Sequence, residues 1–501
     1  MEVKAVVGNL QSIEADAIIV NLFENSELSG ATRAVDEALG GAIQDLVSAG
    51  DFSGKAGQVT VLYPRRVIPA HRVILVGLGD REKFKVETVR RAAASTIQKA
   101  RDLKVNHVAS VTHGAGAGGL NIETAAEAIT EASFMALYGY YQQKSKEAPE
   151  AFPKTLSLVV LNETDLASAE AGVHSGQAIA SGVRIARDLV NMPPNFCTPI
   201  HMAEVAKQVA AEVGLKVTIL EQAQMEALKM GALLSVSQGS DTPPRFIILE
   251  HHADRTQELD TLVLIGKGVT FDTGGYSIKT AEGMENMKND MAGGAAVIGA
   301  MRVIGEMNLP LHVIGIVPSV DNMISGNAFR PSEVITASNG VTIEIISTDA
   351  EGRMILADAL VFADRFKPTA VVDIATLTGA CVTALGGMAA GLFSTSDVLR
   401  DALLMAGEAT NEKVWPMPLF PEYDKLIESN TADIKNSGGR FGGACTAAAF
   451  LNHFVSYPAW AHIDMAGMGM DAKDSSPYLP KGATGYGVRL FVELARRWGQ
   501  A

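Results

Sequence analysis

Short runs of apolar, often β-branched residues alternate with helical stretches along the whole chain, and this alternation limits the folds open to it. Such runs include AIIV at 17–20, RVILVGLG at 72–79, TLVLIGKGV at 261–269 and AVVDIAT at 370–376. Strands of this composition, separated by helices, predict an α/β fold with mostly parallel sheets covered on both faces. Ligands of open parallel sheets bind beyond the carboxyl ends of the strands. The residues that follow each strand are therefore the first place to look for a functional site.

The chain is too long for one domain, because a single hydrophobic core stops growing at roughly 250–300 residues and the sequence has 501. A polar segment, QQKSKEAPEAFPKT at 142–155, precedes the last strand of the first part, and a long helix is expected over 167–188. We therefore predict an amino-terminal α/β domain over residues 1–165 and a larger α/β/α domain with a mostly parallel central sheet over residues 166–501.

The same pattern locates the other elements of both domains. In the first domain we expect further strands at 59–63 and 157–161, and helices at 31–47, 86–103 and 122–141. In the second we expect further strands at 311–319, 341–348 and 460–466, and helices at 292–307, 354–366 and 446–455. The second domain thus repeats the strand-and-helix pattern of the first with longer units.

Charge and cysteine content exclude several classes of protein. The formal charge of -14 repels phosphate backbones and no basic run offsets it, which argues against nucleic acid as a main partner. Cys197, Cys381 and Cys445 are widely spaced and form no metal-binding pattern, as in a protein of a reducing compartment. The amino terminus lacks the apolar core of a signal peptide. We therefore expect a cytoplasmic protein.

One uncharged stretch, residues 374–396, exceeds the ~18 residues at which a membrane helix becomes a candidate. Threonines and glycines interrupt it, which favours a buried strand, a turn and a small-residue segment. We expect no membrane span and no membrane partner.

Charged side chains gather at the ends of three predicted strands. Three segments each overlap the end of a predicted strand and continue beyond it. They are GKGVTFDTGG at the strand over 261–269, STDAEGR at the strand over 341–348, and ATLTGA at the strand over 370–376. Because carboxyl ends of parallel strands meet at one edge of a sheet, the three segments are predicted to share one crevice. With the start of the next helix, they supply Lys267, Asp272, Lys279, Asp290, Asp349, Glu351 and Arg353.

Two interpretations of these acids are open. Taken singly, Asp290 and Asp349 fit helix caps or surface ion pairs. Taken together, four converging carboxylates would be costly unless two divalent cations neutralised them. Without His or Cys in these segments, the ligands suit Zn²⁺, Mn²⁺, Co²⁺ or Mg²⁺ better than a soft-metal site. Such a pair of ions activates water for attack on a carbonyl, and Lys279 or Arg353 could stabilise the resulting oxyanion.

The segments resemble the cytosolic leucyl aminopeptidase family of two-metal exopeptidases. The resemblance is carried by STDAEGRM at 347–354, FDTGGYSIK at 271–279, MKNDMAGGAAV at 287–297, VVDIATLTGA at 371–380 and HIDMAG at 462–467. It implies a metallo-aminopeptidase domain over residues 166–501, peptide substrates, removal of an amino-terminal Leu or other large apolar residue, and a homo-hexamer. The first 165 residues match only in layout, where the family has a small α/β domain similar to macrodomains.

The resemblance also implies a role for each site residue. Asp272 and Glu351 would bridge two ions, of Zn²⁺ or Mn²⁺ with Mg²⁺ or Co²⁺ as alternatives, Asp349 would complete one site, and Asp290 with Lys267 would complete the other. Lys279 would face the developing gem-diolate and Arg353 would hold a bicarbonate that carries the proton. The pocket for the first side chain would be lined by Met287, Thr376, Gly379 and Ala466. Ser347, Met354, Thr280 and Tyr276 depart from the residues usual in the family, and bulky Tyr276 leaves the preferred first residue open.

Three weaker signals receive structural interpretations. Gly114, Gly116 and Gly119 form a G-x-G-x-x-G, but the acidic residue required for dinucleotide binding is absent, so we predict a tight turn. His462 is interpreted as a core histidine without a catalytic role. Cys381 has no paired histidine in its motif and is not expected to act as a nucleophile. The alternative function considered is a regulatory DNA-binding role of the assembled oligomer, which the net charge disfavours.

Overall fold

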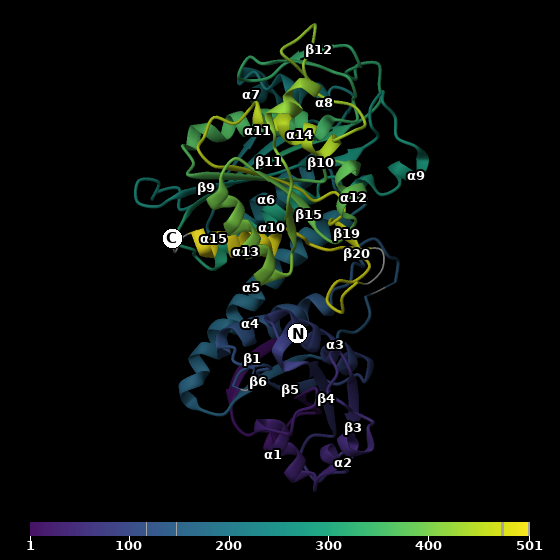
Figure 1. Cartoon of the computed structure of the whole chain (residues 1–501), viewed down its shortest axis with the longest axis vertical. Helices are drawn as coiled ribbons and strands as arrows, with labels where there is room; N and C mark the ends of the chain where they lie inside the picture. The colour runs from purple at the N-terminus through teal and green to yellow at the C-terminus, as the bar shows by residue number, and fades with distance from the viewer. Residues whose placement is uncertain (117, 147, 472–474, 499–501) are drawn as a thin grey trace. The chain divides into compact units, whose positions relative to one another are not determined.

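The computed structural model describes residues 1–116, 118–146, 148–471 and 475–498, and its contacts divide the chain into two units (Figure 1). Unit 1 runs from Met1 to Ala180 and includes a short later segment that ends at Pro480; unit 2 comprises the rest of the chain. The division falls inside the long helix α5 (Leu166–Asn191). The boundary predicted near residue 165 coincides with the start of this helix.

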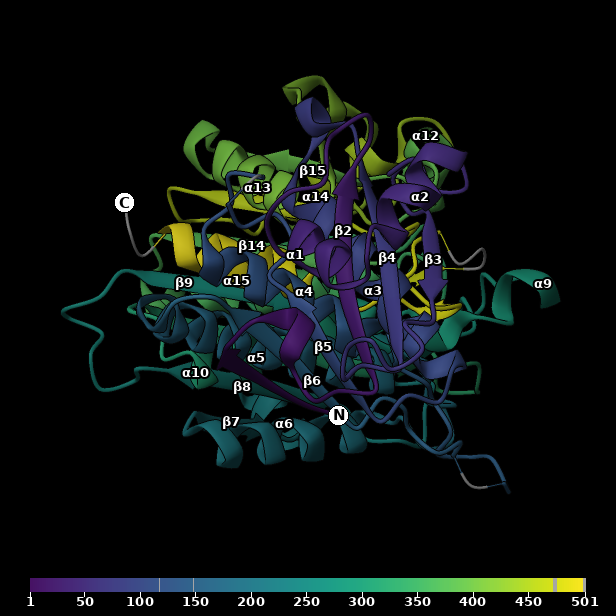
Figure 2. The same ribbon diagram turned by 90° about the horizontal axis from the view of Figure 1, so that it is seen from below.

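Unit 1 is built on a six-stranded sheet in the order β1-β6-β5-β2-β4-β3. The pairs from β1 to β4 are parallel, and β3 pairs antiparallel with β4. Figure 2 shows β2, β4 and β3 side by side, in the order of the sheet. The strands are β1 (Glu2–Val7), β2 (Ala17–Phe23), β3 (Val59–Leu62), β4 (Arg72–Gly79), β5 (His107–Val111) and β6 (Thr155–Val160).

The helices of unit 1 follow the predicted pattern, except that the helix predicted over 122–141 ends at Ala136 and the helix predicted over 31–47 is divided. They are α1 (Gly30–Ala38), α2 (Ala42–Ala49), α3 (Val86–Asp102) and α4 (Ile122–Ala136). The single helix predicted over 31–47 is wrong, because Gly40 and Gly41 adopt positive φ angles of 66° and 92° and separate α1 from α2. Alternate residues of β2, such as Ile18 and Val20, are buried in one apolar cluster with Val35 of α1 and Ile43 of α2.

Unit 2 contains a nine-stranded sheet in the order β16-β15-β18-β14-β9-β11-β8-β7, with β10 paired to β11. Its centre is parallel: β18, β14, β9, β11 and β10 run in one direction, while β8 and β15 run antiparallel to their inner neighbours. The strands are β7 (Lys216–Leu220), β8 (Arg245–His251), β9 (Thr261–Gly266), β10 (Gly268–Asp272), β11 (His312–Asn322), β14 (Ala370–Ala375), β15 (Ala390–Ser394), β16 (Val414–Pro416) and β18 (Trp460–Asp464).

Helices cover both faces of this sheet, as predicted for a mainly parallel sheet. In Figure 1, α11 and α14 lie on one face, and α10 and α15 lie on the other. The helices of unit 2 are α6 (Pro199–Val213), α7 (Gln222–Ala227), α8 (Gly231–Ser237), α9 (Ala281–Met284), α10 (Ala292–Glu306), α11 (Glu351–Ala363), α12 (Gly379–Leu385), α13 (Asp397–Thr410), α14 (Gly443–Asn452) and α15 (Val488–Trp498). A two-stranded sheet joins β19 (Met470–Asp471) to β20 (Gly482–Ala483).

Two predicted strands of unit 2 differ in the structure. The strand expected over 341–348 is not part of the central sheet: β13 (Thr342–Glu344) pairs instead with β12 (Val334–Thr336) and β17 (Ile434–Lys435) in a small sheet. The strand expected over 261–269 is two strands, β9 and β10, interrupted at Lys267. β10 then continues beside β11 with a shift in register.

The uncharged stretch over 374–396 contains the end of β14, the short helix α12 and β15, as its threonines and glycines predict. Within the part of the chain that the structure describes, no helix combines the length and apolar character needed to cross a bilayer.

Candidate metal centre

The predicted crevice lies where neighbouring strands of the central sheet end. β10 ends at Asp272, β9 is followed by Lys267, and β14 is followed by Thr376. Asp290 comes directly after a short 3-10 helix (Met287–Asn289), and Glu351 is the first residue of α11. Carboxylate oxygens of Asp272, Asp290 and Glu351 lie within 4.8 Å of one another, and all three side chains are buried. The carboxyl-edge prediction thus brings together residues from four segments.

Lys267 lies among these carboxylates. Its Nζ is 2.8 Å and 2.7 Å from the two oxygens of Asp290 and 2.8 Å from Glu351 Oε1. It also donates to the carbonyl oxygen of Thr376 at 3.1 Å. Burial disfavours the ammonium form, but the surrounding carboxylates outweigh this effect, so the pKa of Lys267 is raised in the metal-free chain.

A glycine allows Lys267 to reach this position. A Cβ atom at Gly352, in the first turn of α11, would lie 2.6 Å from Lys267 Nζ and 2.6 Å from its Cε. Real Cβ contacts are essentially never that short. Gly352 therefore allows the first turn of α11 to pack directly against the Lys267 side chain. This packing places the Glu351 carboxylate beside Lys267 Nζ.

A second lysine approaches from the other side of the cluster. Lys279 Nζ is 2.8 Å from Asp272 Oδ2 and forms an ion pair with Asp349. The pKa of Lys279 is raised, because Asp272, Glu351 and Asp349 outweigh the opposing effect of burial. The Asp349 side chain is 38% exposed, so it forms the solvent side of the cluster.

The carboxylates are not fully compensated by these lysines. Burial raises the pKa of Asp272, Asp290 and Asp349, and repulsion from neighbouring acids adds to the effect. Among the described residues, Glu351 Oε2 is buried without a hydrogen-bond partner, and Asp290 Oδ2 has only the ion pair with Lys267. Four acids against two ammonium groups leave an excess of negative charge. A buried group of carboxylates with unpaired oxygens fits divalent cations.

Arg353 lies in the first turn of α11, two residues after Glu351. Its guanidinium is buried, and Nη1 donates to the backbone oxygen of Asn436 at 2.8 Å. Its Nε has no hydrogen-bond partner among the residues that the structure describes. Burial lowers the pKa of Arg353 to about 10, so the group stays charged at neutral pH. A charged guanidinium with a free N–H can hold a small anion.

The expected pocket residues come from the segment before Asp290 and from the segments that follow β14 and β18. Thr376 Oγ1 donates to Asp290 Oδ1 at 2.8 Å, and Met287 opens the turn that ends at Asp290. Gly379 begins α12, and a Cβ built there would meet no atom within 4 Å. Ala466 follows β18, the strand next to β14.

Three positioning residues escaped the sequence interpretation. Asn322, at the end of β11, donates from Nδ2 to Asp272 Oδ1 at 2.8 Å and to Thr348 O at 3.0 Å. Asn436 accepts the N–H groups of Ile346 and Ser347 on its Oδ1 at 2.8 and 3.2 Å, which satisfies the backbone before Asp349 without a central strand. Asn322 could have been found from the sequence, because it is a polar residue at the end of an apolar strand. Asn436 could not, because it lies 87 residues beyond Asp349 in the chain and has no local motif.

Asp464 is the third of these residues. Its carboxylate accepts the N–H groups of Leu377, Thr378 and Ala466, each at 3.3 Å, and the hydroxyl of Thr378 at 2.6 Å. It therefore ties the loop after β14 to the loop after β18. The motif HIDMAG contains Asp464, but its hydrogen bonds are to the loop that follows β14, the strand beside β18.

The two residues set aside from the chemistry are core residues. His462 is buried, with Nδ1 2.5 Å from Asp373 Oδ1, and Trp460 Nε1 donates to Asp373 Oδ2 at 2.7 Å. Burial, followed by the charge of Asp464, raises the pKa of the Cys381 thiol to about 12. Because the thiolate is the nucleophile, a thiol with that pKa is inert near neutral pH.

Comparison with known proteins decides the family. The catalytic domain of the cytosol aminopeptidase family matches residues 184–492, and the N-terminal domain of the same family matches residues 19–147. The chain belongs to the cytosol aminopeptidase family. It is accordingly an aminopeptidase, a hydrolase of peptide bonds, and the resemblance carried by the motifs is confirmed.

Relatives within the cytosol aminopeptidase family match over nearly the full length. A "Probable cytosol aminopeptidase" of Roseiflexus castenholzii is 43% identical over 502 residues, covering 100% of both chains. One of Burkholderia cenocepacia is 44% identical over 495 residues, covering 97% of this chain and 96% of the relative.

Solved structures agree in fold with these relatives. A mutant of tomato leucine aminopeptidase has a TM-score of 0.88 and 33% identity, covering 99% of this chain and 96% of that one. The bottromycin maturation enzyme BotP in complex with Mn has a TM-score of 0.85 and 31% identity, covering 96% of this chain and 99% of that one. The predicted fold, a small α/β domain before a larger α/β domain, is confirmed.

Proposed function

We propose that this aminopeptidase works with two divalent metal ions held by Asp272, Asp290, Asp349, Glu351 and Lys267. The observation that supports the proposal is the buried Glu351 Oε2, which has no hydrogen-bond partner in the part of the chain that the structure describes. It belongs to a group of three carboxylates whose oxygens lie within 4.8 Å of one another. Leaving such an acceptor unpaired costs about 1–3 kcal/mol or more, and a cation would remove that cost. BotP, which is similar in structure, has been solved in complex with Mn.

The resemblance distributes the ligands between two sites. Asp272 and Glu351 would be shared, Asp349 would serve one ion, and Asp290 with Lys267 would serve the other. Lys267 must lose a proton to act as a ligand, and the approach of a cation favours this loss because it reverses the field that now raises the pKa of Lys267. When bound, the ions polarise the scissile carbonyl and activate water.

The chain's own cations would act on the developing negative charge. Lys279 is held by Asp272 and Asp349, so its N–H groups can shift to an oxyanion that forms beside them. Arg353 would hold a small anion such as bicarbonate at its unpaired Nε. Its lowered pKa, about 10, still leaves it protonated at neutral pH.

The first side chain of the substrate would enter between Met287, Thr376, Gly379 and Ala466. The free space beside Gly379 supports this placement. We propose Leu and other large apolar residues as substrates. Tyr276 bears on the selectivity: its side chain is 45% exposed, and its hydroxyl donates to Ser325 O at 3.0 Å, which fixes the ring near the loop after β11.

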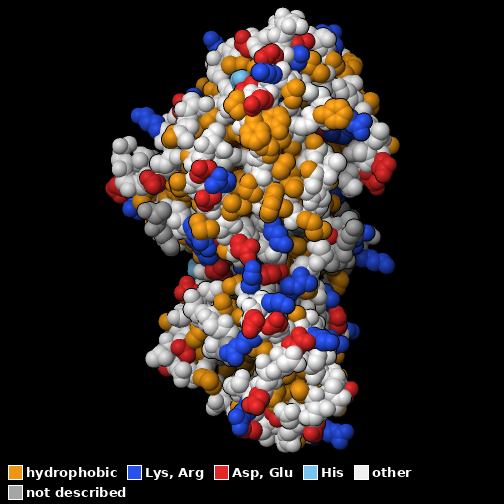
Figure 3. All heavy atoms as spheres, viewed as in Figure 1, with side chains coloured by type: hydrophobic (Ala, Val, Ile, Leu, Met, Phe, Trp, Pro, Cys, Tyr) orange, Lys and Arg blue, Asp and Glu red, His pale blue; other side chains and the backbone are white. Residues whose placement is uncertain are grey.

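A homo-hexamer is proposed on the family resemblance, and the surface supports self-association. Figure 3 shows hydrophobic side chains gathered on one face of unit 2. Exposed apolar side chains of unit 2 include Trp415, Phe420 and Phe441, which are 61%, 59% and 85% exposed. Exposed apolar patches are typical of interfaces. A monomer in light scattering at micromolar concentration would contradict the hexamer.

A cytoplasmic location is proposed only from the cysteine usage.

The decisive experiment for the function compares a free tripeptide with its amino-acetylated form. An exopeptidase locates the chain end through the free α-amine, so acetylation should lower the rate by ~10²-fold or more through lost alignment. Mass spectrometry should show stepwise loss from the amino end. Internal cuts, or equal rates on both peptides, would refute the proposal.

A further inference from the structure

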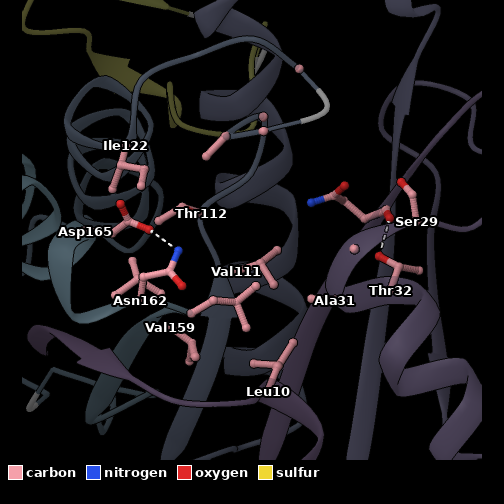
Figure 4. Close-up of a pocket in the computed structure, with 18 of the residues that line it drawn as sticks. Leu10, Ser29, Ala31, Thr32, Val111, Thr112, Ile122, Val159, Asn162 and Asp165 are labelled. Carbon is pink, nitrogen blue, oxygen red and sulfur yellow. Dashed lines mark hydrogen bonds between the residues drawn. The ribbon is translucent and has the colours of Figure 1, made fainter.

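The glycine motif of unit 1 forms the tight turn that the sequence predicts. Gly114 and Gly116 have φ angles of 83° and 74°, and both line a cavity of about 460 Å³. Figure 4 shows Asn162 and Asp165 paired on one side of this cavity, where Asn162 donates to Asp165 Oδ2 at 3.1 Å. None of the described residues that line the cavity has a buried polar side-chain atom without a partner, so it is assigned no ligand.

Lys288 joins the segment beside the metal centre of unit 2 to the end of helix α5. It is half-buried in the 3-10 turn Met287–Asn289, and its Nζ donates to the backbone oxygen of Asn191 at 2.8 Å. The turn leads directly into Asp290. Lys288 therefore lies between Met287, which is proposed to line the pocket, and a proposed metal ligand.

The sequence explains why the Asn191 oxygen is available to a lysine. Asn191 is the last residue of α5, and the carbonyl groups of a last helical turn have no N–H donor inside the helix. Pro193 and Pro194 follow closely, and proline has no N–H, so Pro194 cannot close a turn onto this oxygen. A lysine at a helix C-terminus is stabilised both by the hydrogen bond and by the helix dipole.

The side chain of Asn191 anchors a second segment. Its Oδ1 accepts the N–H of Ala483, in β20, at 3.1 Å. β20 pairs with β19, and β19 follows the loop that contains Ala466. A Cβ atom at Gly482 would lie 2.8 Å from Asn191 Oδ1, and φ there is 109°, so this approach requires glycine. Asn191 thus fixes both the segment of Met287 and the segment that leads from Ala466.

The position of Met287 depends on Lys288 because the residues before it have few other anchors. Among the described residues, the hydrogen bonds of residues 280–287 all lie within residues 280–290. Figure 1 and Figure 2 both show α9, which belongs to this segment, standing away from the rest of unit 2. Lys279 fixes one end of the segment through its ion pairs, and Lys288 fixes the other.

Asp290 has anchors of its own. Its Oδ1 accepts hydrogen bonds from Lys267 Nζ and from Thr376 Oγ1, each at 2.8 Å. Its backbone oxygen lies 3.2 Å from the same Thr376 hydroxyl. Loss of the hydrogen bond of Lys288 would therefore release Met287, whereas the carboxylate of Asp290 would keep its partners.

We propose that Lys288 is a positioning residue that sets the size selectivity of the pocket for the first side chain. The inference rests on the proposed function, which places Met287 against that side chain. A leucine side chain reaches this wall with its carbons beyond Cβ, whereas an alanine side chain ends at Cβ. Displacing Met287 therefore removes dispersion contacts from leucine and leaves alanine unaffected.

The test measures kcat and KM of full-length, metal-loaded Lys288→Met on leucine amide and alanine amide. Methionine keeps an unbranched side chain but cannot donate a hydrogen bond. We expect KM for leucine amide to rise about tenfold, the scale of one methylene contact in an apolar pocket, with kcat within about threefold of the parent. The kinetics on alanine amide and the metal content should match those of the parent. Lys288→Arg, which can still donate to Asn191 O, should restore the leucine preference.

A double-mutant cycle shows whether Lys288 acts through Met287. Met287→Ala should lower the leucine preference by itself. Adding Lys288→Met should then lower it by less than about threefold further, because the effects of coupled residues are not additive. Lys216→Met is the matched control: it removes a lysine hydrogen bond of the same length, 2.8 Å, to Glu250 on the neighbouring strand, and should leave the preference unchanged. Lys288→Ala removes the ammonium group a second way and serves if Lys288→Met does not fold.

Three results would overturn the role of Lys288. They are an unchanged leucine preference in its Met and Ala variants, an equal loss on both amides, and additive effects in the cycle. Loss of metal together with an equal loss on both amides would assign Lys288 to the metal centre instead. A parent enzyme that hydrolyses both amides equally would overturn the proposed pocket, and this inference with it. That result appears in the parent, so it is distinct from a failure seen only in the variants.

Discussion

Replacing Gly352 by alanine tests whether the position of Lys267 controls metal binding. The added Cβ would lie 2.6 Å from Lys267 Nζ, and ordinary contact begins at 3.4 Å, so Nζ must retreat by about 0.8 Å. Nζ now lies 2.7–2.8 Å from the Asp290 and Glu351 oxygens. A shift of that size exceeds the tolerance of a metal ligand, which is about 0.2 Å.

The fold should survive this substitution, because the displaced atom is the end of a flexible side chain and alanine is the better helix former by about 1 kcal/mol. We expect ~10²-fold lower kcat/KM on a leucine amide, as for a ~1 Å misplacement in an active site. Metal content, measured by mass spectrometry after dialysis, should fall as well.

Gly326→Ala is the matched control. It adds the same methyl group in the loop after β11, where no atom lies within 4 Å of the new Cβ and φ is not positive. This variant should keep both activity and metal. If Gly352→Ala retained full metal content and a kcat/KM within about threefold of the parent, Lys267 would not be held in place by this contact and the reasoning would fail.

Three further predictions concern the metals and the catalytic cation. Chelation should abolish activity and two divalent ions per chain should restore it; saturation of activity and binding at one ion would contradict this. Lys279→Ala should retain metal yet lose ~10²- to 10³-fold in turnover, whereas Glu351→Gln should lose metal, and a near-normal rate for Lys279→Ala would reject its role. Because burial raises the pKa of Asp272, Asp290 and Asp349 above 3.8, protons held by the folded metal-free chain must leave before metal binds. The rise in Tm on adding metal should therefore grow as the pH rises from the acidic side towards neutrality, and a constant rise in scanning calorimetry over that range would show that no buried acid titrates there.

The fold class and the acidic cluster could be predicted from the sequence, because both depend on local patterns. β-branched runs such as AIIV at 17–20 and AVVDIAT at 370–376 favour strands when they are buried. The rule that ligands bind at the carboxyl ends of parallel strands then brought Lys267 and Asp272 to one edge, and the structure confirms this placement. The family motifs added the roles of individual residues, which spacing alone does not give.

The path of the chain to Asp349 was mispredicted. The apolar run over 341–348 has the composition of a central strand, but β13 pairs with β17, and Ile343 lies opposite Ile434. Side-chain periodicity reports which face of a segment is buried; it does not report which backbone accepts its hydrogen bonds. Asp349 therefore comes from a loop whose backbone is held by Asn436, and Glu351 from the first residue of α11.

The α/β class was thus determined by the sequence itself, which also supplied the residues that we propose carry the chemistry. Tertiary structure alone decided that Asn322 and Asp464 orient the site, and that Lys288 bonds the end of α5. The physical reason is the same in each case. Residue type and periodicity encode what a side chain can do and whether it is buried, whereas the partner of a hydrogen bond or the space beside a helix end depends on segments tens to hundreds of residues away, which meet only when the sheet has formed.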